Sequence, residues 1–310
     1  MKTFSRSQGL VFLAGVALLA GCSGGSQLGV NPAQQNLTLR VAQSGRSWMA
    51  PDAKKSDLAY ISNFYSSTIL AFTYPGGKYV GLISGLADPQ GECTSKTSNG
   101  DWWGVASGST EVLEYAHGGT TPLKTLNVAG GEPAGCTVDP TTGNLAVTIL
   151  GTGNVVLFTG GSGSGTTLSD SLYSTYFASY DDKGDLFVDG ITSSDTYGLV
   201  ELPKGSSTFV SITLSPSLGF PGELQWHDNY LAVGASGGIY HFAIHGTKGK
   251  EIGVTPRCGG GGFWIQGRYV TETDAGNEDA VICKYPAGSP YKTLHGNFDL
   301  PIGVTVSVAK

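Results

Sequence analysis

Two glutamates stand at matching places in the chain, because each follows a glycine and precedes a short apolar segment: Gly91-Glu92 and Gly222-Glu223. If the fold brings both carboxylates to one axis, they can attract a cation, and Ca²⁺ prefers carboxylate and carbonyl oxygens. The alternative is a pair of solvated charges, since exposed glutamate is common at protein surfaces. The choice depends on the elements that position Glu92 and Glu223. No other cofactor is indicated.

Four cysteines besides Cys22 form an even set, which suits disulfides in an oxidising compartment. Three pairings are possible among Cys93, Cys136, Cys258 and Cys283. Cys93 and Cys136 occupy near-equivalent places in consecutive repeats, and Cys258 and Cys283 share one repeat, so we expect the disulfides 93–136 and 258–283. Zinc binding is the alternative, but no Cys-x-x-Cys pair occurs and the histidines are not spaced to complete a site.

Other polar groups are typical of turns and strands. The acidic loop at residues 274–279 offers several oxygen ligands, yet it lacks the EF-hand pattern, and Asp, Asn and Gly are also preferred turn residues. His227 and Asp228 fall in an expected turn with no evident nucleophile beside them, so serine hydrolysis has no support. His241 and His245 are expected to pack in or near a strand.

Four tryptophans lie near the starts of repeat strands. They are Trp102, Trp103, Trp226 and Trp264. A ring that approaches the axis could stack on a sugar or an aromatic ligand, whereas packing between the repeats is the alternative, because such a core needs large apolar side chains.

A repeat of about 40 residues in a β-rich chain predicts a β-propeller. A turn followed by an apolar strand recurs six times, beginning at Ser56, Gly100, Gly143, Gly184, Asn229 and Gly267. A second strand follows each, beginning at Ile69, Val112, Val155, Leu199, Ile239 and Ile282. A Pro-x-Gly or Pro-Gly entry begins at Pro89, Pro133, Pro221 and Pro301. We therefore expect an all-β, six-bladed propeller, with outer strands near residues 79–84, 123–128, 209–214 and 291–294.

The end of the chain is expected to close the ring. Residues 304–308, Val-Thr-Val-Ser-Val, have the pattern of an inner strand, but no blade follows them, and the first repeat lacks an inner strand. The C-terminal strand should pair into the first blade, which removes an exposed sheet edge. In a six-bladed ring, blades two and five face each other, so Glu92 and Glu223 should point toward one axis.

The spacing of Pro-x-Gly, Gly-Asn/Asp-Leu and Ile-x-x-Tyr/Phe resembles that of NHL-type six-bladed propellers, most clearly at residues 133–147. The resemblance covers most of the chain and implies a fold rather than a function, since this propeller carries unrelated roles. Lactonases of similar fold coordinate a divalent ion with Glu, Asn and Asp at the axis, and only Glu92 and Glu223 match here. We expect a binding or scaffolding module that is not an enzyme, with a metal-dependent lactonase-like or lyase-like enzyme as the alternative.

The N-terminus has the zones of a secretory signal: Lys2 and Arg6, an apolar run over residues 9–20, and Leu19-Ala20-Gly21-Cys22. The run is shorter than the roughly 20 residues that a membrane-spanning helix needs. The tetrapeptide resembles the lipobox of bacterial lipoproteins, which implies cleavage before Cys22 and diacylglycerol on its thiol. An ordinary signal peptide with an incidental cysteine is the alternative.

These patterns predict a signal peptide at residues 1–21, a lipidated Cys22 with a flexible tether to residue 56, and a propeller over residues 57–310. The location expected is the extracytoplasmic cell envelope. Ser23 rather than Asp follows the cysteine, which permits the outer membrane if the source has one.

Composition agrees with this prediction and excludes one class of partner. The 48 glycines and the 14% charged residues suit short strands joined by tight turns. With 24 acidic against 18 basic residues and no Lys/Arg cluster, the chain is unsuited to nucleic acid. The partners expected are the membrane, through the lipid anchor, and an unknown small molecule or protein.

Overall fold

A computed structural model describes residues 46–94 and 101–310, and Cys22 with its lipobox lies outside these ranges. One compact unit spans Ser44–Lys310. Its regular structure is β, apart from three short 3₁₀ helices among the described residues: η1 (Ala53–Lys55), η2 (Ser107–Ser109) and η3 (Thr159–Gly161). Within those residues, no helix is long and apolar enough to cross a membrane.

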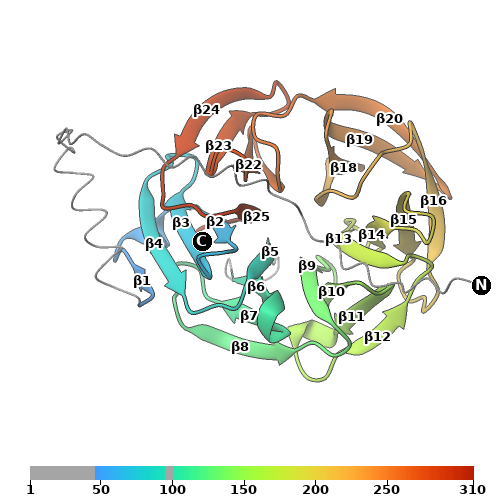
Figure 1. Ribbon diagram of the computed structural model, residues 1–310, viewed down its shortest axis with the longest axis horizontal. Coiled ribbons are helices and arrows are strands. Elements are labelled where there is room, and N and C mark those ends of the chain that lie inside the picture. The colour runs from blue at the N-terminus through green and yellow to red at the C-terminus, as the bar shows by residue number, and fades with distance from the viewer. Residues whose placement is uncertain (1–45, 95–100) are drawn as a thin grey trace, which may run out of the picture. The chain divides into compact units, whose positions relative to one another are not determined.

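The strands form five sheets arranged around a central axis (Figure 1). The first sheet has the order β1 (Trp48–Met49), β4 (Tyr79–Ser84), β3 (Thr68–Thr73), β2 (Leu58–Asn63) and β25 (Pro301–Ser307). The second runs from β5 (Pro89–Thr94) through β6 (Trp102–Ala106) and β7 (Glu111–Tyr115) to β8 (Pro122–Asn127). The third contains β9 (Glu132–Val138), β10 (Leu145–Leu150), β11 (Asn154–Phe158) and β12 (Thr166–Ser169). Another four-stranded sheet contains β21 (Phe263–Gln266), β22 (Tyr269–Asp274), β23 (Asp279–Lys284) and β24 (Ser289–Leu294).

The remaining sheet has eight strands and differs from the expected separate blades. Its first antiparallel set is β13 (Ser174–Tyr180), β14 (Leu186–Ile191), β15 (Tyr197–Leu202) and β16 (Val210–Ser215). Its second set is β17 (Leu224–His227), β18 (Tyr230–Ala235), β19 (Gly238–His245) and β20 (Lys248–Thr255). The outer strands β16 and β20 pair in parallel, with Leu214 opposite Gly249. This pairing satisfies backbone groups on two sheet edges, which explains why five sheets appear where six were expected.

The C-terminal strand closes the ring as expected. β25 pairs antiparallel with β2, with Leu58 opposite Ser307 and Ile61 opposite Val304. Beyond the strand, the backbone N–H of Ala309 donates to the Asp57 carboxylate at 2.9 Å. Before Asp57, within the segment expected to be a tether, β1 pairs with the outer strand β4.

Aromatic and aliphatic side chains fill the spaces between neighbouring sheets. Between the first two sheets, Trp102 is stacked between Tyr60 and Tyr115, with ring centroids 4.1 and 4.9 Å apart. The core between the second and third sheets joins Trp103 and Val105 to residues of β9–β11 such as Phe158. Each sheet is therefore held mainly by its two neighbours.

The innermost strands contact one another in the closed order β25, β5, β9, β13, β17, β21 and back to β25. Glycine permits the close approach. A Cβ on Gly91 would lie 2.6 Å from the Ala134 carbonyl oxygen, and one on Gly135 would lie 2.8 Å from that of Tyr176. A Cβ on Gly303 would collide with the Gln90 carbonyl and with the Glu92 carboxylate.

Both expected disulfides are confirmed. Cys93–Cys136 joins β5 to β9 and therefore links two sheets, with Cα atoms 5.7 Å apart. Cys258–Cys283 connects the segment before β21 to β23, with Cα atoms 6.6 Å apart.

We expect Gly303→Ala to destabilise the fold by about 1–3 kcal/mol, because the adjoining backbones of β25 and β5 must move apart. Chemical denaturation measures this difference. Gly260→Ala is the matched control, since a Cβ added at Gly260 would have nothing within 4 Å. Equal destabilisation by the two substitutions would show that the inner strands are not tightly apposed.

Removing the inter-sheet disulfide with Cys93→Ser/Cys136→Ser should lower the free energy of unfolding by about 2–4 kcal/mol, because the unfolded chain gains freedom over a 43-residue separation. Unfolding the double variant and the oxidised parent side by side in urea checks this. Identical midpoints would contradict a stabilising link between β5 and β9.

Candidate functional site

The inner strands run in the same direction. The first residues of one strand lie beside the first residues of its neighbour, and the last residues lie beside the last. Gly303 lies near Gln90 at the starts of β25 and β5, and Thr94 lies near Val306 at their ends. We call the end of the ring where the inner strands begin the entry face. The opposite end, where they finish, is the exit face.

Glu92 lies inside the ring rather than at its rim. Its residue surface is 2% exposed, and neither carboxylate oxygen has a hydrogen-bond partner among the described residues. Burial raises the pKa of Glu92 well above its ordinary value, and repulsion from Glu223 raises it further, against a smaller opposing effect of the Ser62 hydroxyl. Burial of this kind favours the protonated form of a carboxyl.

Glu223 shares this electrostatic environment but reaches solvent. It precedes β17, is partly exposed and lines a cavity at the exit face. Burial raises its pKa well above the ordinary value, repulsion from Asp189 adds to this, and Arg257 acts in the opposite direction. Glu223 therefore lies close enough to Glu92 for repulsion between the two carboxyls to raise the pKa of Glu92.

Asp189 is a third buried carboxyl that sequence reasoning missed. It lies on β14 and accepts hydrogen bonds from the backbone N–H groups of Phe177 and Gly222, each at 3.1 Å. These bonds tie β13 to the segment before β17. Burial still raises the pKa of Asp189 well above its ordinary value.

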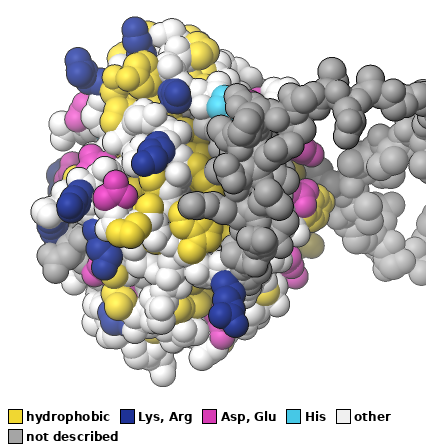
Figure 2. Space-filling model, turned by 90° about the vertical axis from the view of Figure 1, so that its left-hand side faces the viewer, with side chains coloured by type: hydrophobic (Ala, Val, Ile, Leu, Met, Phe, Trp, Pro, Cys, Tyr) yellow, Lys and Arg dark blue, Asp and Glu magenta, His cyan; other side chains and the backbone are white. Residues whose placement is uncertain are grey.

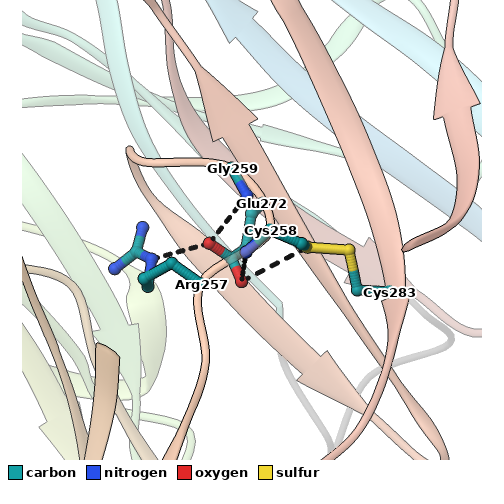
Figure 3. The surroundings of a disulfide bond; sticks show 5 residues. All are labelled: Arg257, Cys258, Gly259, Glu272 and Cys283. Carbon is teal, nitrogen blue, oxygen red and sulfur yellow. Dashed lines mark hydrogen bonds and ion pairs between the residues drawn. A yellow bond between two sulfur atoms is a disulfide. The ribbon is translucent and has the colours of Figure 1, made fainter. Parts of the chain in front are cut away.

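Arg257 and Glu272 form a buried ion pair beside the Cys258–Cys283 disulfide (Figure 3). The Arg257 Nε donates to the carboxylate at 2.6 Å, and the guanidinium also bonds the Gly261 carbonyl. The backbone N–H groups of Cys258 and Gly259 donate to the same carboxylate, each at 3.3 Å. Glu272 is thereby satisfied and is not available as an open ligand.

Two of these carboxyls are committed to partners within the protein. Among residues 46–94 and 101–310, no three His, Cys, Asp or Glu side chains gather as metal ligands. The carboxylate of Asp189 accepts hydrogen bonds from backbone N–H groups, and that of Glu272 accepts one from Arg257. The acidic loop at residues 274–279 is a hairpin whose Asp274 accepts from its own Gly276 and Asn277. Cation binding by Glu92 and Glu223 stays an untested prediction.

A small cavity of about 50 Å³ opens at the exit face. Side chains on the inner strands brace its walls by bonding to the next strand. Ser179 accepts from the Trp226 backbone N–H at 2.8 Å, and the Gln225 amide bonds both backbone groups of Ile265 at 2.6 and 2.9 Å. Thr137 similarly accepts from the Tyr180 N–H at 3.2 Å, and the Cys93–Cys136 disulfide links β5 to β9.

All four tryptophans pack against the cores between sheets, and two of them also line the exit-face cavity. Trp102 and Trp103 are buried in the cores between sheets. Trp226 and Trp264 pack on neighbouring sheets and also line the exit-face cavity. Trp226 lies nearly parallel to Phe187, with centroids 5.7 Å apart, so its ring is fixed in place.

A second polar cluster lies between β17, β19 and the end of β23. The His241 ring stacks on Tyr230 at 4.6 Å, and its Nε2 lies 3.1 Å from the Tyr285 hydroxyl. His227 contacts Asp228 at 3.3 Å. Burial lowers the pKa of His241, and nearby His227 lowers it further.

Ser236 is the central residue of a Gly-x-Ser-x-Gly sequence at residues 234–238. It lies in the tight hairpin between β18 and β19. A nucleophile elbow requires a turn from a strand into a helix, so this hairpin is not one.

The entry face presents exposed aromatic and acidic side chains to solvent. Three aromatic side chains on or beside its loops are exposed: Tyr65 at 67%, Tyr173 at 60% and Phe220 at 52%. Exposed acidic residues of this face are Asp88, Glu132, Asp195 and Glu278. Among the described residues of its loops, the only Lys or Arg is Arg257, which is committed to Glu272. By contrast, the outer wall in Figure 2 carries basic, acidic and hydrophobic side chains interspersed.

The buried position of Glu92 predicts a pH-dependent stability. Because its folded-state pKa is raised above the unfolded value, the native state holds an extra proton, and stability falls as pH rises from about 4.5 toward the folded-state pKa. Glu92→Gln should remove this part of the pH dependence and stabilise the protein at pH 8 by about 1 kcal/mol or more. Denaturation between pH 5 and 8 measures it, with exposed Glu132→Gln as control. Parallel pH profiles for the parent and Glu92→Gln would contradict it.

Comparisons with known proteins support the fold. No protein-family model matches the chain, and no curated protein sequence matches it. The chain is similar to one in a crystal structure of a nidogen/laminin complex, with a TM-score of 0.67 and 10% sequence identity over 82% of this chain and 100% of the other. At that identity the likeness shows the fold alone, and it agrees with the ring of sheets described above: this chain is a β-propeller.

Proposed function

We propose that this chain is a lipid-anchored, extracytoplasmic binding module in which an NHL-type, six-bladed propeller docks a protein partner on its entry face. The exposed aromatic triplet Tyr65, Tyr173 and Phe220 carries this proposal. Large aromatic side chains dominate the binding energy of protein interfaces, and loops on a rigid scaffold are where binding residues concentrate.

The anchor is the part of the proposal that rests on sequence. The signal at residues 1–21, the lipidated Cys22 and the tether to residue 56 are inferred from the lipobox resemblance, with the propeller following from residue 57. The two disulfides are compatible with an extracytoplasmic location. Two or three acyl chains, each adding about 0.8 kcal/mol per buried methylene, would hold the chain at a membrane surface.

Six blades are inferred by counting the eight-stranded sheet as two. Its two antiparallel sets each supply one inner strand, β13 and β17, to the closed ring of inner strands. The pairing of β16 with β20 then joins neighbouring blades at their outer edges without changing the ring.

Tyr176 adds a second ring beside Phe220. The Phe220 ring meets Tyr176 edge to face, with centroids 5.7 Å apart, while Phe220 stays half exposed. Tyr65 lies in the hairpin between β2 and β3 and meets Phe64 in the same way at 5.4 Å. Each of these two exposed rings is in contact with a neighbouring ring, which limits the side-chain entropy lost on binding.

Charge indicates the kind of partner. The entry-face loops carry acidic side chains without a free Lys or Arg among the described residues, so a partner with basic residues around an apolar centre complements this face. The neighbour of similar fold comes from a complex of two proteins, which supports the proposal by analogy.

Site-specific photo-cross-linking in the full-length, membrane-bound protein tests the proposal. A photo-reactive residue at position 65, 173 or 220 should give one adduct of discrete mass, because these side chains would lie at the centre of the interface. The same residue at Tyr291 or Leu123, exposed on outer strands, should give no such adduct.

Charge reversal supplies the control for electrostatics. Asp88→Lys with Glu132→Lys should weaken the adduct at least several-fold, and added salt should weaken it in the parent. Adducts of equal strength from the entry face and from positions 123 and 291, or none at the entry face, would overturn the proposed docking surface.

A further inference from the structure

The two disulfides differ in how far solvent reaches their sulfurs. Cys258 is partly exposed, in the entry-face loop that precedes β21, whereas Cys93, Cys136 and Cys283 are exposed by 2%, 7% and 0%. We propose that Cys258–Cys283 is a site of thiol–disulfide exchange, attacked at Cys258 by a small thiol or a protein dithiol. The proposal does not depend on a protein partner at the entry face.

Access determines which sulfur reacts. Exchange begins when a thiolate reaches one sulfur of a disulfide, so a buried sulfur is protected. Cys283 lies on β23 and packs in a core with Val270 and Phe263. Cys258 is therefore the sulfur that an incoming thiolate meets first.

A buried carboxylate stands ready to stabilise the reduced form. The Cys258 Sγ lies 3.5 Å from a Glu272 oxygen, a contact drawn in Figure 3. In the disulfide this sulfur has no proton to donate, whereas the thiol formed on reduction can donate to the carboxylate. Glu272 is already held in place by Arg257 and by the backbone N–H groups of Cys258 and Gly259. The dithiol thus gains an interaction that the disulfide lacks, which favours reduction.

The exchange proceeds in two balanced steps. The thiolate of the reductant bonds to the Cys258 Sγ, the Sγ–Sγ bond breaks, and its electron pair leaves on Cys283, which takes up a proton. A second thiolate of the reductant then attacks the mixed disulfide, so that the reductant departs as its own disulfide. Cys258 leaves as a thiolate, takes up a proton and donates to Glu272. Two reductant thiols are oxidised, and one protein disulfide is reduced.

The surrounding sheet does not depend on this link. Cys283 stays paired in the ladder, because β21, β22 and β23 are joined by their own backbone bonds. The loop is also retained by the N–H groups of Gly260 and Gly261, which both donate to the Thr273 carbonyl. Reduction should therefore loosen residues 256–262 at the entry face without unfolding the propeller.

Graded reduction of the intact, full-length protein tests the proposal. The protein is equilibrated with glutathione buffers, quenched, alkylated and mapped by peptide mass spectrometry. We expect Cys258–Cys283 to open with at least about 10-fold less reduced glutathione than Cys93–Cys136, while the melting transition stays cooperative. Opening of Cys93–Cys136 first, or opening of Cys258–Cys283 only where the protein unfolds, would overturn the proposal.

A matched pair of serine variants identifies the attacked sulfur. In folded Cys283→Ser, iodoacetamide should modify Cys258 at least about 10-fold faster than it modifies Cys283 in folded Cys258→Ser. If either variant fails to fold, the parent decides, because glutathione trapped by acid quenching should be attached to Cys258. Equal alkylation rates, or glutathione on Cys283, would contradict attack at Cys258.

Glu272→Gln tests the role of the carboxylate, since the neutral amide is a weaker acceptor for the thiol. At one fixed glutathione buffer, the ratio of dithiol to disulfide should fall several-fold relative to the parent. Glu114→Gln, which removes an ion pair with Lys124 in another sheet, should leave this ratio unchanged. An unchanged ratio in folded Glu272→Gln would remove the carboxylate from the account. If Glu272→Gln does not fold, the glutathione titration and the serine variants decide the proposal.

These outcomes are separate from the docking surface. Exchange confined to Cys258–Cys283 without entry-face cross-linking would count against the protein partner alone, and the reverse result would count against the exchange site alone.

Discussion

Close contact between neighbouring inner strands is the constraint on which the rest of this structure depends. At the entry-face half of the ring, glycines such as Gly91 and Gly135 allow backbone to meet backbone. At the exit-face half, side chains such as Ser179 and Gln225 bond the backbone of the next strand. The pairing of β25 with β2 brings the last inner strand back to the first sheet, so the contacts form a closed circle. A closed circle leaves each blade little freedom to move without its neighbours.

The same contacts explain the electrostatics of the axis. Inner strands that approach this closely exclude water, so Glu92, Asp189 and Glu223 are desolvated and their pKa values rise. Hydrogen bonds from two backbone N–H groups offset the cost of burying Asp189, and the ion pair with Arg257 offsets the cost of burying Glu272. Glu92 has no such compensation among the described residues. The ring therefore encloses carboxyls whose protonated forms are favoured by burial.

Much of the fold could be predicted from the sequence because its signals are local. The turn-and-strand repeat locates the strands, and the inner-strand pattern without a following blade at residues 304–308 predicts closure. Equivalent repeat positions likewise predict the partners of Cys93 and Cys136. The pairing of β16 with β20 could not be predicted, since it depends on how far two outer strands lean toward each other and no residue type marks it.

The candidate site was harder to predict, because it depends on which side of a strand faces the axis. Glu92 carries the same sequence pattern as Glu223, yet Glu92 is enclosed and Glu223 opens onto the exit-face cavity. Asp189 was missed, although an acidic residue within the apolar stretch Leu-Phe-Val-Asp is a signal of a buried carboxyl. Trp226 and Trp264 pack against neighbouring sheets and also line a cavity. Packing and exposure to a ligand are alternatives in the sequence-based prediction, which therefore missed this combination.

Native-state hydrogen exchange measures most directly whether the inner strands form one closed, mutually braced ring. The amides of Phe177, Tyr180, Gly222, Trp226, Ile265 and Gly303, which donate to side chains of neighbouring strands, should exchange only through global unfolding and share one opening free energy. Opening of any one of these strands at a clearly lower free energy than the others would show that the blades are independent, and it would contradict the account of a preformed scaffold.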